Sequence, residues 1–153
     1  MGDNNPKYTI TSDTILWNHF RAGDDKSFSL IYRTYVQQLY KYGIKFTADR
    51  ELVLDCIQDL FVSLYKHRQN LGETNNIKLY LFISFKRSLV CALRKKSKTQ
   101  LFPFDQLPFL TVFSSGTEYS ESATDMERIN RLNKALKTLS PRQKEAIYLR
   151  FSN

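Results

Sequence analysis

Apolar side chains recur along most of the chain at steps of three and four residues. This spacing places them on one face of an α-helix, with polar side chains on the opposite face. The pattern predicts helices over about residues 12–21, 25–46, 50–70, 77–98 and 125–139, and a further helix that starts near residue 141. The chain has 5 glycines and 4 prolines, which are too few for a β protein with many tight turns. We therefore expect an all-α protein whose first four helices form a small bundle.

The apolar stripes also define a predicted core that is rich in aromatic side chains. On the second, third and fourth helices they consist of Phe28, Ile31, Tyr32, Tyr35, Leu39, Tyr42, Phe46, Val53, Ile57, Leu60, Phe61, Leu64, Leu81, Phe82, Phe85, Leu89, Ala92 and Leu93. These aromatics could form a base-stacking surface, but their helical spacing favours core packing. Cys56 and Cys91 lie among apolar neighbours without a CxxC motif, so we expect reduced, buried thiols.

The helical period is absent between residues 99 and 124, where two prolines and a cluster of Ser, Gly and Thr occur. We interpret this segment as a flexible linker between a helical domain at 1–98 and a second helical segment at 125–153. The apolar side chains of the linker are expected to dock on a neighbouring domain or on a partner. The periodicity of the helix at 125–139 places Ile129, Leu132, Leu136 and Leu139 on its inward face. After it, Ser140, Pro141 and Gln143 have the order of a helix start: a capping Ser, Pro at the first position and Gln three residues after the cap.

The formal net charge of +8 is unevenly distributed. Acidic and basic residues balance over 1–76, residues 101–125 have only acidic charges, and residues 126–153 are basic again. The segment 77–100 carries no acidic residue, and its basic residues are Lys78, Lys86, Arg87, Arg94, Lys95, Lys96 and Lys98. A helix with one apolar stripe and a cationic opposite face is suited to nucleic acid. An ordinary solvated helix and a surface for anionic lipid are the alternatives, and the lipid alternative conflicts with burial of the apolar stripe in a bundle.

Two polar stretches precede this basic helix. The third predicted helix has an outer face of Asp55, Gln58, Asp59 and Ser63, which is either a partner-binding surface or an ordinary solvated face. The polar segment 68–76 is predicted to be a loop that leads into the basic helix. A polar loop beside cations, with Tyr80 at the edge of the apolar stripe, has the components needed to bind unpaired bases.

Catalytic chemistry has little support in the sequence. Asp55 and Asp59 share a helix face, but no nucleophile or histidine is arranged with them, so we do not expect an enzyme. His19 and His67 stand alone, and no metal site or cofactor is expected. No signal peptide is visible, and the longest apolar run is too short to cross a bilayer, so we expect a cytoplasmic protein without membrane insertion.

Two motifs resemble a known family. The D-x-x-Q-D-x-F-x-x-L run from Asp55 to Leu64, together with the basic helix, resembles the second conserved region of bacterial sigma factors of the extracytoplasmic-function group. The L-S-P-R-Q run from Leu139 to Gln143 is similar to the opening of the fourth region of that group, where a helix-turn-helix domain begins. The resemblance implies a sigma factor that binds core RNA polymerase and recognises and melts the promoter −10 element.

The resemblance also implies roles for particular residues. The face of Asp55, Gln58, Asp59 and Ser63 would bind the clamp coiled coil of the polymerase. The loop 70–76 would receive a flipped base, and the basic helix would contact the melted strand. The implied DNA-binding residues are Asn70, Asn75, Asn76, Lys78, Tyr80, Lys86, Arg87, Arg94, Lys95 and Lys96.

The sequence departs from the family pattern in two ways. Many members have Asn and Asp where this chain has Arg87 and Cys91, so a base preference does not transfer. The similarity to the fourth region ends before a recognition helix, so we expect an incomplete helix-turn-helix domain that does not read −35 DNA. The alternative function is therefore a truncated, sigma-like regulatory protein. Such a protein would bind polymerase or an anti-sigma factor without starting transcription.

Overall fold

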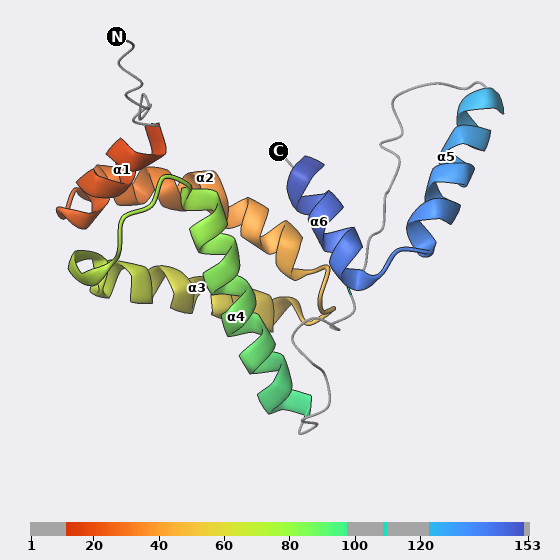
Figure 1. Ribbon diagram of the computed structural model, residues 1–153. Coiled ribbons are helices and arrows are strands. Elements are labelled where there is room, and N and C mark those ends of the chain that lie inside the picture. The colour runs from red at the N-terminus through yellow and green to blue at the C-terminus, as the bar shows by residue number, and fades with distance from the viewer. Residues whose placement is uncertain (1–11, 98–108, 110–122, 152–153) are drawn as a thin grey trace, which may run out of the picture. The chain divides into compact units, whose positions relative to one another are not determined.

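The computed structural model describes residues 12–97, 109 and 123–151, and every regular element in these ranges is helical (Figure 1). The prediction of an all-α protein is therefore confirmed. The chain divides into two compact units, Met1–Ser97 and Lys98–Asn153. The predicted linker falls largely outside the described residues.

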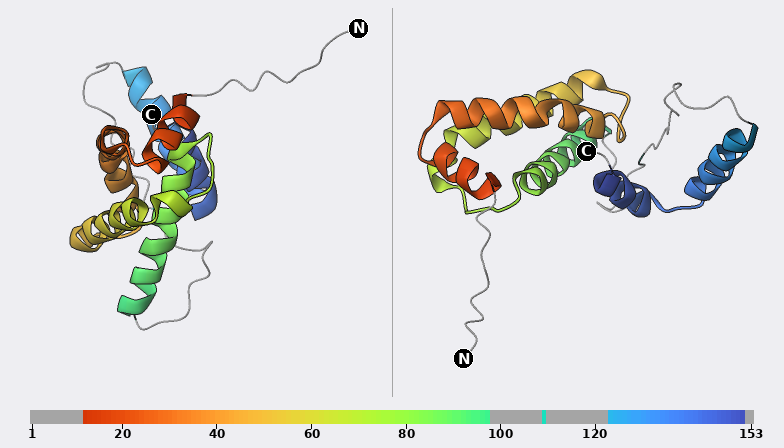
Figure 2. Two further views of the ribbon diagram at one scale, coloured as in Figure 1. Left: turned by 90° about the vertical axis from the view of Figure 1, so that its left-hand side faces the viewer. Right: turned by 90° about the horizontal axis from the view of Figure 1, so that it is seen from above.

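The first unit contains α1 (Ser12–Arg21), α2 (Asp25–Gly43), α3 (Arg50–Lys66), the short 3₁₀ helix η1 (Arg68–Asn70) and α4 (Ile77–Ser97). Helices α2 and α3 run antiparallel and side by side, and α4 crosses them (Figures 1 and 2). Two predicted ends were too late, because α2 stops at Gly43 and α3 at Lys66.

Local sequence signals determine where the helices start and stop. Asp24 and Asp49 cap α2 and α3 by accepting hydrogen bonds from the amides of Ser27 (2.9 Å) and Leu52 (3.1 Å). The hydrogen bonds from Ser27 hold the pKa of Asp24 below its ordinary value. Helix α1 ends before Gly23, whose φ of +99° is in the left-handed region that favours glycine.

The core of the first unit is made of the predicted stripes and of α1. Its most deeply buried side chains are Trp17, Phe20, Ile31, Leu39, Tyr42, Val53, Ile77, Leu81, Phe85, Leu89 and Val90. Aromatic rings contact one another through this core, as Tyr42 does with Phe46 and Phe82 at centroid distances of 5.0 Å. Core packing is therefore the main use of the aromatic stripe.

Gly43 lies where α2 packs against both α3 and α4. A Cβ atom at this position would be 2.7 Å from Val53 Cγ1 and 2.9 Å from the ring of Phe85, and both of these side chains are fully buried. Only a residue without a side chain allows this approach. The position of α4 against the α2 and α3 pair therefore depends on Gly43.

Three predictions about burial were wrong. Tyr32 is 43% exposed because it lies at the outer edge of the α2 stripe. Cys91 is exposed, since it faces away from the stripe of α4, whereas Cys56 is buried, and burial raises the pKa of its thiol. Leu132, which the periodicity placed inside, is 55% exposed.

The second unit contains α5 (Ala123–Lys137) and α6 (Pro141–Phe151). The predicted helix start forms a reciprocal capping box: the amide of Ser140 donates to Gln143 Oε1 (2.9 Å), and the amide of Gln143 donates to Ser140 Oγ (3.3 Å). The ring of Phe109 contacts that of Tyr148 at 5.6 Å. None of the described helices is long and apolar enough to span a membrane.

Candidate functional site

Helix α3 exposes all four residues of the predicted polymerase-binding face. All four side chains, Asp55, Gln58, Asp59 and Ser63, are exposed, and they follow one another at helical spacing. The Ser63 hydroxyl lies 3.4 Å from Nδ1 of His67, just past the end of the helix. The structure thus gathers the four side chains on one accessible face, which carries two carboxylates.

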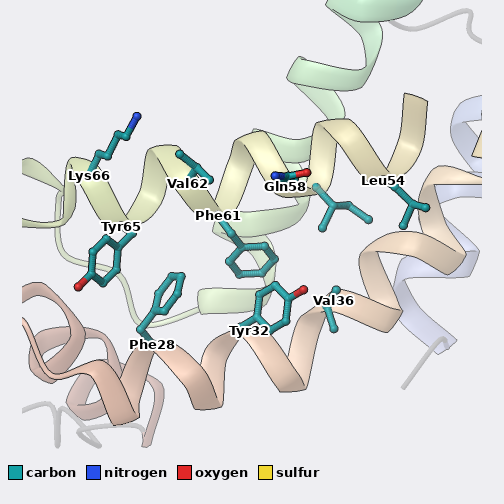
Figure 3. Close-up of a pocket in the computed structure, with 10 residues that line it drawn as sticks. Phe28, Tyr32, Val36, Leu54, Gln58, Phe61, Val62, Tyr65 and Lys66 are labelled. Atoms are coloured by element: carbon teal, nitrogen blue, oxygen red, sulfur yellow. The ribbon is translucent and has the colours of Figure 1, made fainter. Parts of the chain in front are cut away.

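An apolar groove adjoins this face, between α2 and α3 (Figure 3). Its volume is about 640 Å³, and Figure 3 shows side chains from both helices pointing toward each other across it. It is lined by Phe28, Tyr32, Val36, Leu54, Ile57, Gln58, Phe61, Val62, Tyr65 and Lys66. Gln58 belongs both to the groove and to the polar face, so the two surfaces are continuous.

The groove was not predicted from the sequence. Leu54 is 52% exposed and Val62 is 44% exposed, although both are large aliphatic residues. They lie off the buried stripe of α3, so periodicity gave them no role. Exposed aliphatic side chains beside a polar rim are typical of a protein-binding surface. A groove between two helices can accept the apolar face of a third helix.

The loop before α4 is held by side chains at both of its ends. The indole N–H of Trp17 donates to the carbonyl oxygen of Gly72 (2.8 Å). At the other end, Asn76 Oδ1 accepts a hydrogen bond from the amide of Leu79 (2.8 Å), and Asp13 Oδ2 accepts one from the amide of Ile77 (3.0 Å). Helix α4 therefore begins at a capped and fixed position.

These contacts assign structural roles to some of the predicted DNA-binding residues. The side chain of Asn76 caps α4, and the half-buried ring of Tyr80 packs on Trp17 at a centroid distance of 5.0 Å. Asn70 and Asn75 are exposed, Asn70 as the last residue of η1. Asn75, Asn76 and Tyr80 are therefore close together at the start of α4.

The basic residues of α4 do not form a single face. Arg87, Arg94 and Lys95 are all exposed, and Arg94 and Lys95 lie about two turns after Arg87 on the outer side of the helix. Lys78 and Lys86 are half-buried, with their ammonium groups 5.8 Å and 5.7 Å from the ring centroids of Phe82 and Phe46.

Lys96 makes an ion pair with Asp49, the cap of α3. The hydrogen bond with Asp49 raises the pKa of Lys96, and the same bond is the main cause that lowers the pKa of Asp49. This pair joins the last turn of α4 to the first turn of α3. The sequence did not predict it, because the two residues are 47 positions apart.

The exposed side of α4 changes character along its length. Leu79 and Ile83 are 53% and 44% exposed, and they precede Arg87 on the same side by eight and four residues. The helix therefore presents aliphatic surface near the loop and cationic surface toward its C-terminal end. The residues that the structure describes contain no cluster of His, Cys, Asp or Glu suited to a metal ion.

A comparison with known protein families finds a match for the part of the chain that contains most of α2 and all of α3 and α4. Residues 31–99 match Sigma-70 region 2. The match begins within α2 and includes α3, η1, the loop and all of α4. No curated protein and no solved structure matches the chain.

The match covers less than half of the chain, and within residues 31–99 it supports a second region of the sigma-70 type. Proteins with sigma-70 region 2 are transcription initiation factors and not enzymes, which agrees with the expectation from the sequence. The match also supports binding of core RNA polymerase and of the promoter −10 region. Helix α1 lies outside the matched residues.

Proposed function

We propose that this protein is a sigma factor of the extracytoplasmic-function group, which acts in the cytoplasm. In this proposal residues 1–98 form region 2, 99–124 a linker, and 125–153 the start of region 4. The observation that carries the proposal is the match of residues 31–99 to Sigma-70 region 2. The capping box of Ser140 and Gln143 supports the assignment of the last segment, because that segment resembles the start of region 4.

Core RNA polymerase is proposed to bind the exposed face of α3. Asp55 and Asp59 would pair with basic side chains of the clamp coiled coil, while Gln58 and Ser63 would form hydrogen bonds at the same surface. The groove between α2 and α3 supports this role, because a coiled-coil helix presents aliphatic side chains that an apolar groove can bury. An anti-sigma factor that competes for the same surface is a further proposed partner.

Unpaired DNA of the −10 element is proposed to bind α4 and the preceding loop. Arg87, Arg94 and Lys95 form the main phosphate contact, because all three are exposed on one side of α4. Lys78, Lys86 and Lys96 would make additional phosphate contacts beside these three residues. The loop with Asn70, Asn75 and Asn76, next to Tyr80, would receive an extruded base.

The polymerase contact is tested by charge reversal on α3. The Asp55→Lys/Asp59→Lys double variant should weaken binding of the full chain to core polymerase by at least about ten-fold, because attraction becomes repulsion. Glu73→Lys is a matched control, since Glu73 is an exposed acid in the loop and not on α3. Equal binding by the double variant and the wild type, measured by fluorescence anisotropy, would contradict the assignment of the face.

The DNA contact is tested by charge reversal on α4. We expect Arg87→Glu/Lys95→Glu to weaken binding of the polymerase complex to a random single-stranded DNA pool and to make its salt dependence less steep. Lys26→Glu is the control, because Lys26 is exposed in the first turn of α2, where a negative charge is tolerated. Run-off transcription on linear templates with randomised upstream sequence separates a sigma factor from a regulatory protein that does not initiate.

A further inference from the structure

Helix α1 places three residues of one face against the loop that precedes α4. Asp13, Trp17 and Arg21 are spaced by four residues and therefore lie on the same side of α1. Each contacts a different part of the segment 72–77: Asp13 accepts from the amide of Ile77, and Trp17 donates to the carbonyl of Gly72. The guanidinium of Arg21 lies 3.9 Å from the carboxylate of Glu73. We call this side of α1 the loop-facing side.

Trp17 links the loop to the first turn of α4. Its side chain is completely buried, and its ring contacts the rings of Phe20 (5.4 Å) and Tyr80 (5.0 Å). The same residue therefore bonds to the loop backbone and packs on a side chain of α4. The hydrogen bond joins residues that are 55 positions apart, so α1 holds a segment that is distant from it in the sequence.

The loop has little apolar burial of its own to fix its conformation. Gly72, Glu73, Asn75 and Asn76 are all exposed, and a Cβ atom at Gly72 would meet no other atom within 4 Å. A segment with few buried contacts opens easily unless other interactions hold it. The contacts from the loop-facing side of α1 are therefore a main source of order between Gly72 and Ile77.

We infer that α1 is a positioning element for base recognition by the loop, with Trp17 and Asp13 as its key residues. This inference rests on the proposed function, because it assumes that the loop receives an unpaired base. A base that binds a loop held in one conformation does not have to supply the ordering free energy. It also meets donors and acceptors at fixed positions, so one base is favoured over the others. The DNA-recognition unit thus extends upstream of the matched residues 31–99 to Asp13.

The test uses the full chain bound to core polymerase and a pool of single-stranded DNA with randomised sequence. Selection from the pool measures the enrichment of one base over the others at each position. Trp17→Phe keeps an aromatic ring in the core but removes the N–H that donates to Gly72. Loss of one such hydrogen bond should reduce the base enrichment by about five-fold. Affinity for polymerase and total affinity for the pool should remain close to those of the wild type.

Phe20→Leu is the control for a general loss of stability. Phe20 is buried on the same helix and packs on Trp17 and Phe28, but its side chain has no polar atom that could bond to the loop backbone. We expect this variant to keep the base enrichment. If Trp17→Phe keeps the wild-type enrichment, or if Phe20→Leu reduces it equally, the inference is overturned. If the wild-type complex does not bind the pool at all, the proposed function fails and this inference fails with it.

A second pair of variants examines Asp13. Asp13→Ala removes the acceptor for the Ile77 amide, whereas Asp13→Asn retains an acceptor oxygen at the same position. We expect the alanine variant to lose base enrichment and to show faster hydrogen exchange at Ile77, and the asparagine variant to recover both. Equal enrichment in Asp13→Ala and in the wild type would overturn the role of Asp13.

Discussion

Gly43 of α2 lies so close to Val53 of α3 that a Cβ atom on Gly43 would be only 2.7 Å from Val53 Cγ1. The ring of Phe85 is 2.9 Å from the same point, so a Cβ atom on Gly43 would overlap with both neighbours. Val53 is β-branched and fully buried, and it cannot rotate away without moving α3.

We therefore expect Gly43→Ala to destabilise the protein. Forcing a methyl group into a well-packed core costs about 1–3 kcal/mol, which outweighs the higher helix propensity of alanine. Urea denaturation of the full chain measures the difference. Gly72→Ala is the matched control, since nothing lies within 4 Å of its Cβ position. Similar unfolding midpoints for the two variants would contradict the close packing at Gly43.

The ion pair between Asp49 and Lys96 predicts a pH dependence. The pKa of Asp49 is lowered in the folded protein from an ordinary value of 3.8, so its carboxylate stabilises the fold above that pH. This stabilisation disappears as the pH falls through the lowered folded-state pKa. Asp49→Asn keeps an oxygen that can cap α3 but removes the charge. The melting temperature of the variant should therefore be below that of the wild type near neutral pH, and the difference should shrink in acid.

Lys96 provides the control for this pH effect. Its pKa is raised from 10.5, so its part of the stabilisation is present below that value and disappears in strong alkali. In a Lys96→Ala background the effect of Asp49→Asn should be smaller, because the partner charge is already absent. An effect of unchanged size in that background would show that the ion pair is not the cause.

The same pair limits the charge that Lys96 offers to DNA. If the proposed function is correct, Asp49→Asn releases Lys96 to contact a phosphate. Each added contact to a single strand makes the slope of log affinity against log salt more negative by about 0.7. The comparison is a salt titration with random single-stranded DNA. Asp49→Asn/Lys96→Ala should show no such increase, and an equal increase in this double variant would disprove the mechanism.

The groove predicts a variant that affects binding but not stability. Leu54 is 52% exposed, so Leu54→Ser should change the free energy of unfolding by less than about 0.5 kcal/mol. If core polymerase occupies the groove, the same variant should weaken polymerase binding by about five-fold or more. Ile15→Ser is a matched control, because Ile15 is 49% exposed but lies on α1. Equal polymerase affinities for the two variants would exclude the groove as a contact.

Local signals in the sequence were sufficient to predict the helices and most of the core. The spacing of Val53, Ile57 and Leu64 on α3 predicted their burial, because a helix of that length has only one side against its neighbours. Caps were equally readable, since Asp49 and Ser140 act on amides within three residues of themselves.

Long-range contacts could not be predicted from the sequence. The hydrogen bond from Trp17 to Gly72 and the ion pair of Asp49 with Lys96 depend on where and at what angle the helices cross. The periodicity of apolar residues predicts which side of a helix is buried, but it does not predict the crossing point or angle. The exposure of Cys91, by contrast, follows from its place off the apolar stripe of α4, which the periodicity alone already gives. For the candidate site, the sequence predicted the accessible polar face of α3 but missed the groove beside it.

The hydrogen bond from the Ile77 amide to Asp13 has a practical consequence for work with fragments. An excised domain trimmed to residues 31–99 would lack the carboxylate that receives this amide, and the first turn of α4 would be more prone to fraying and proteolysis. A fragment intended for crystallisation or NMR should therefore start no later than Ser12.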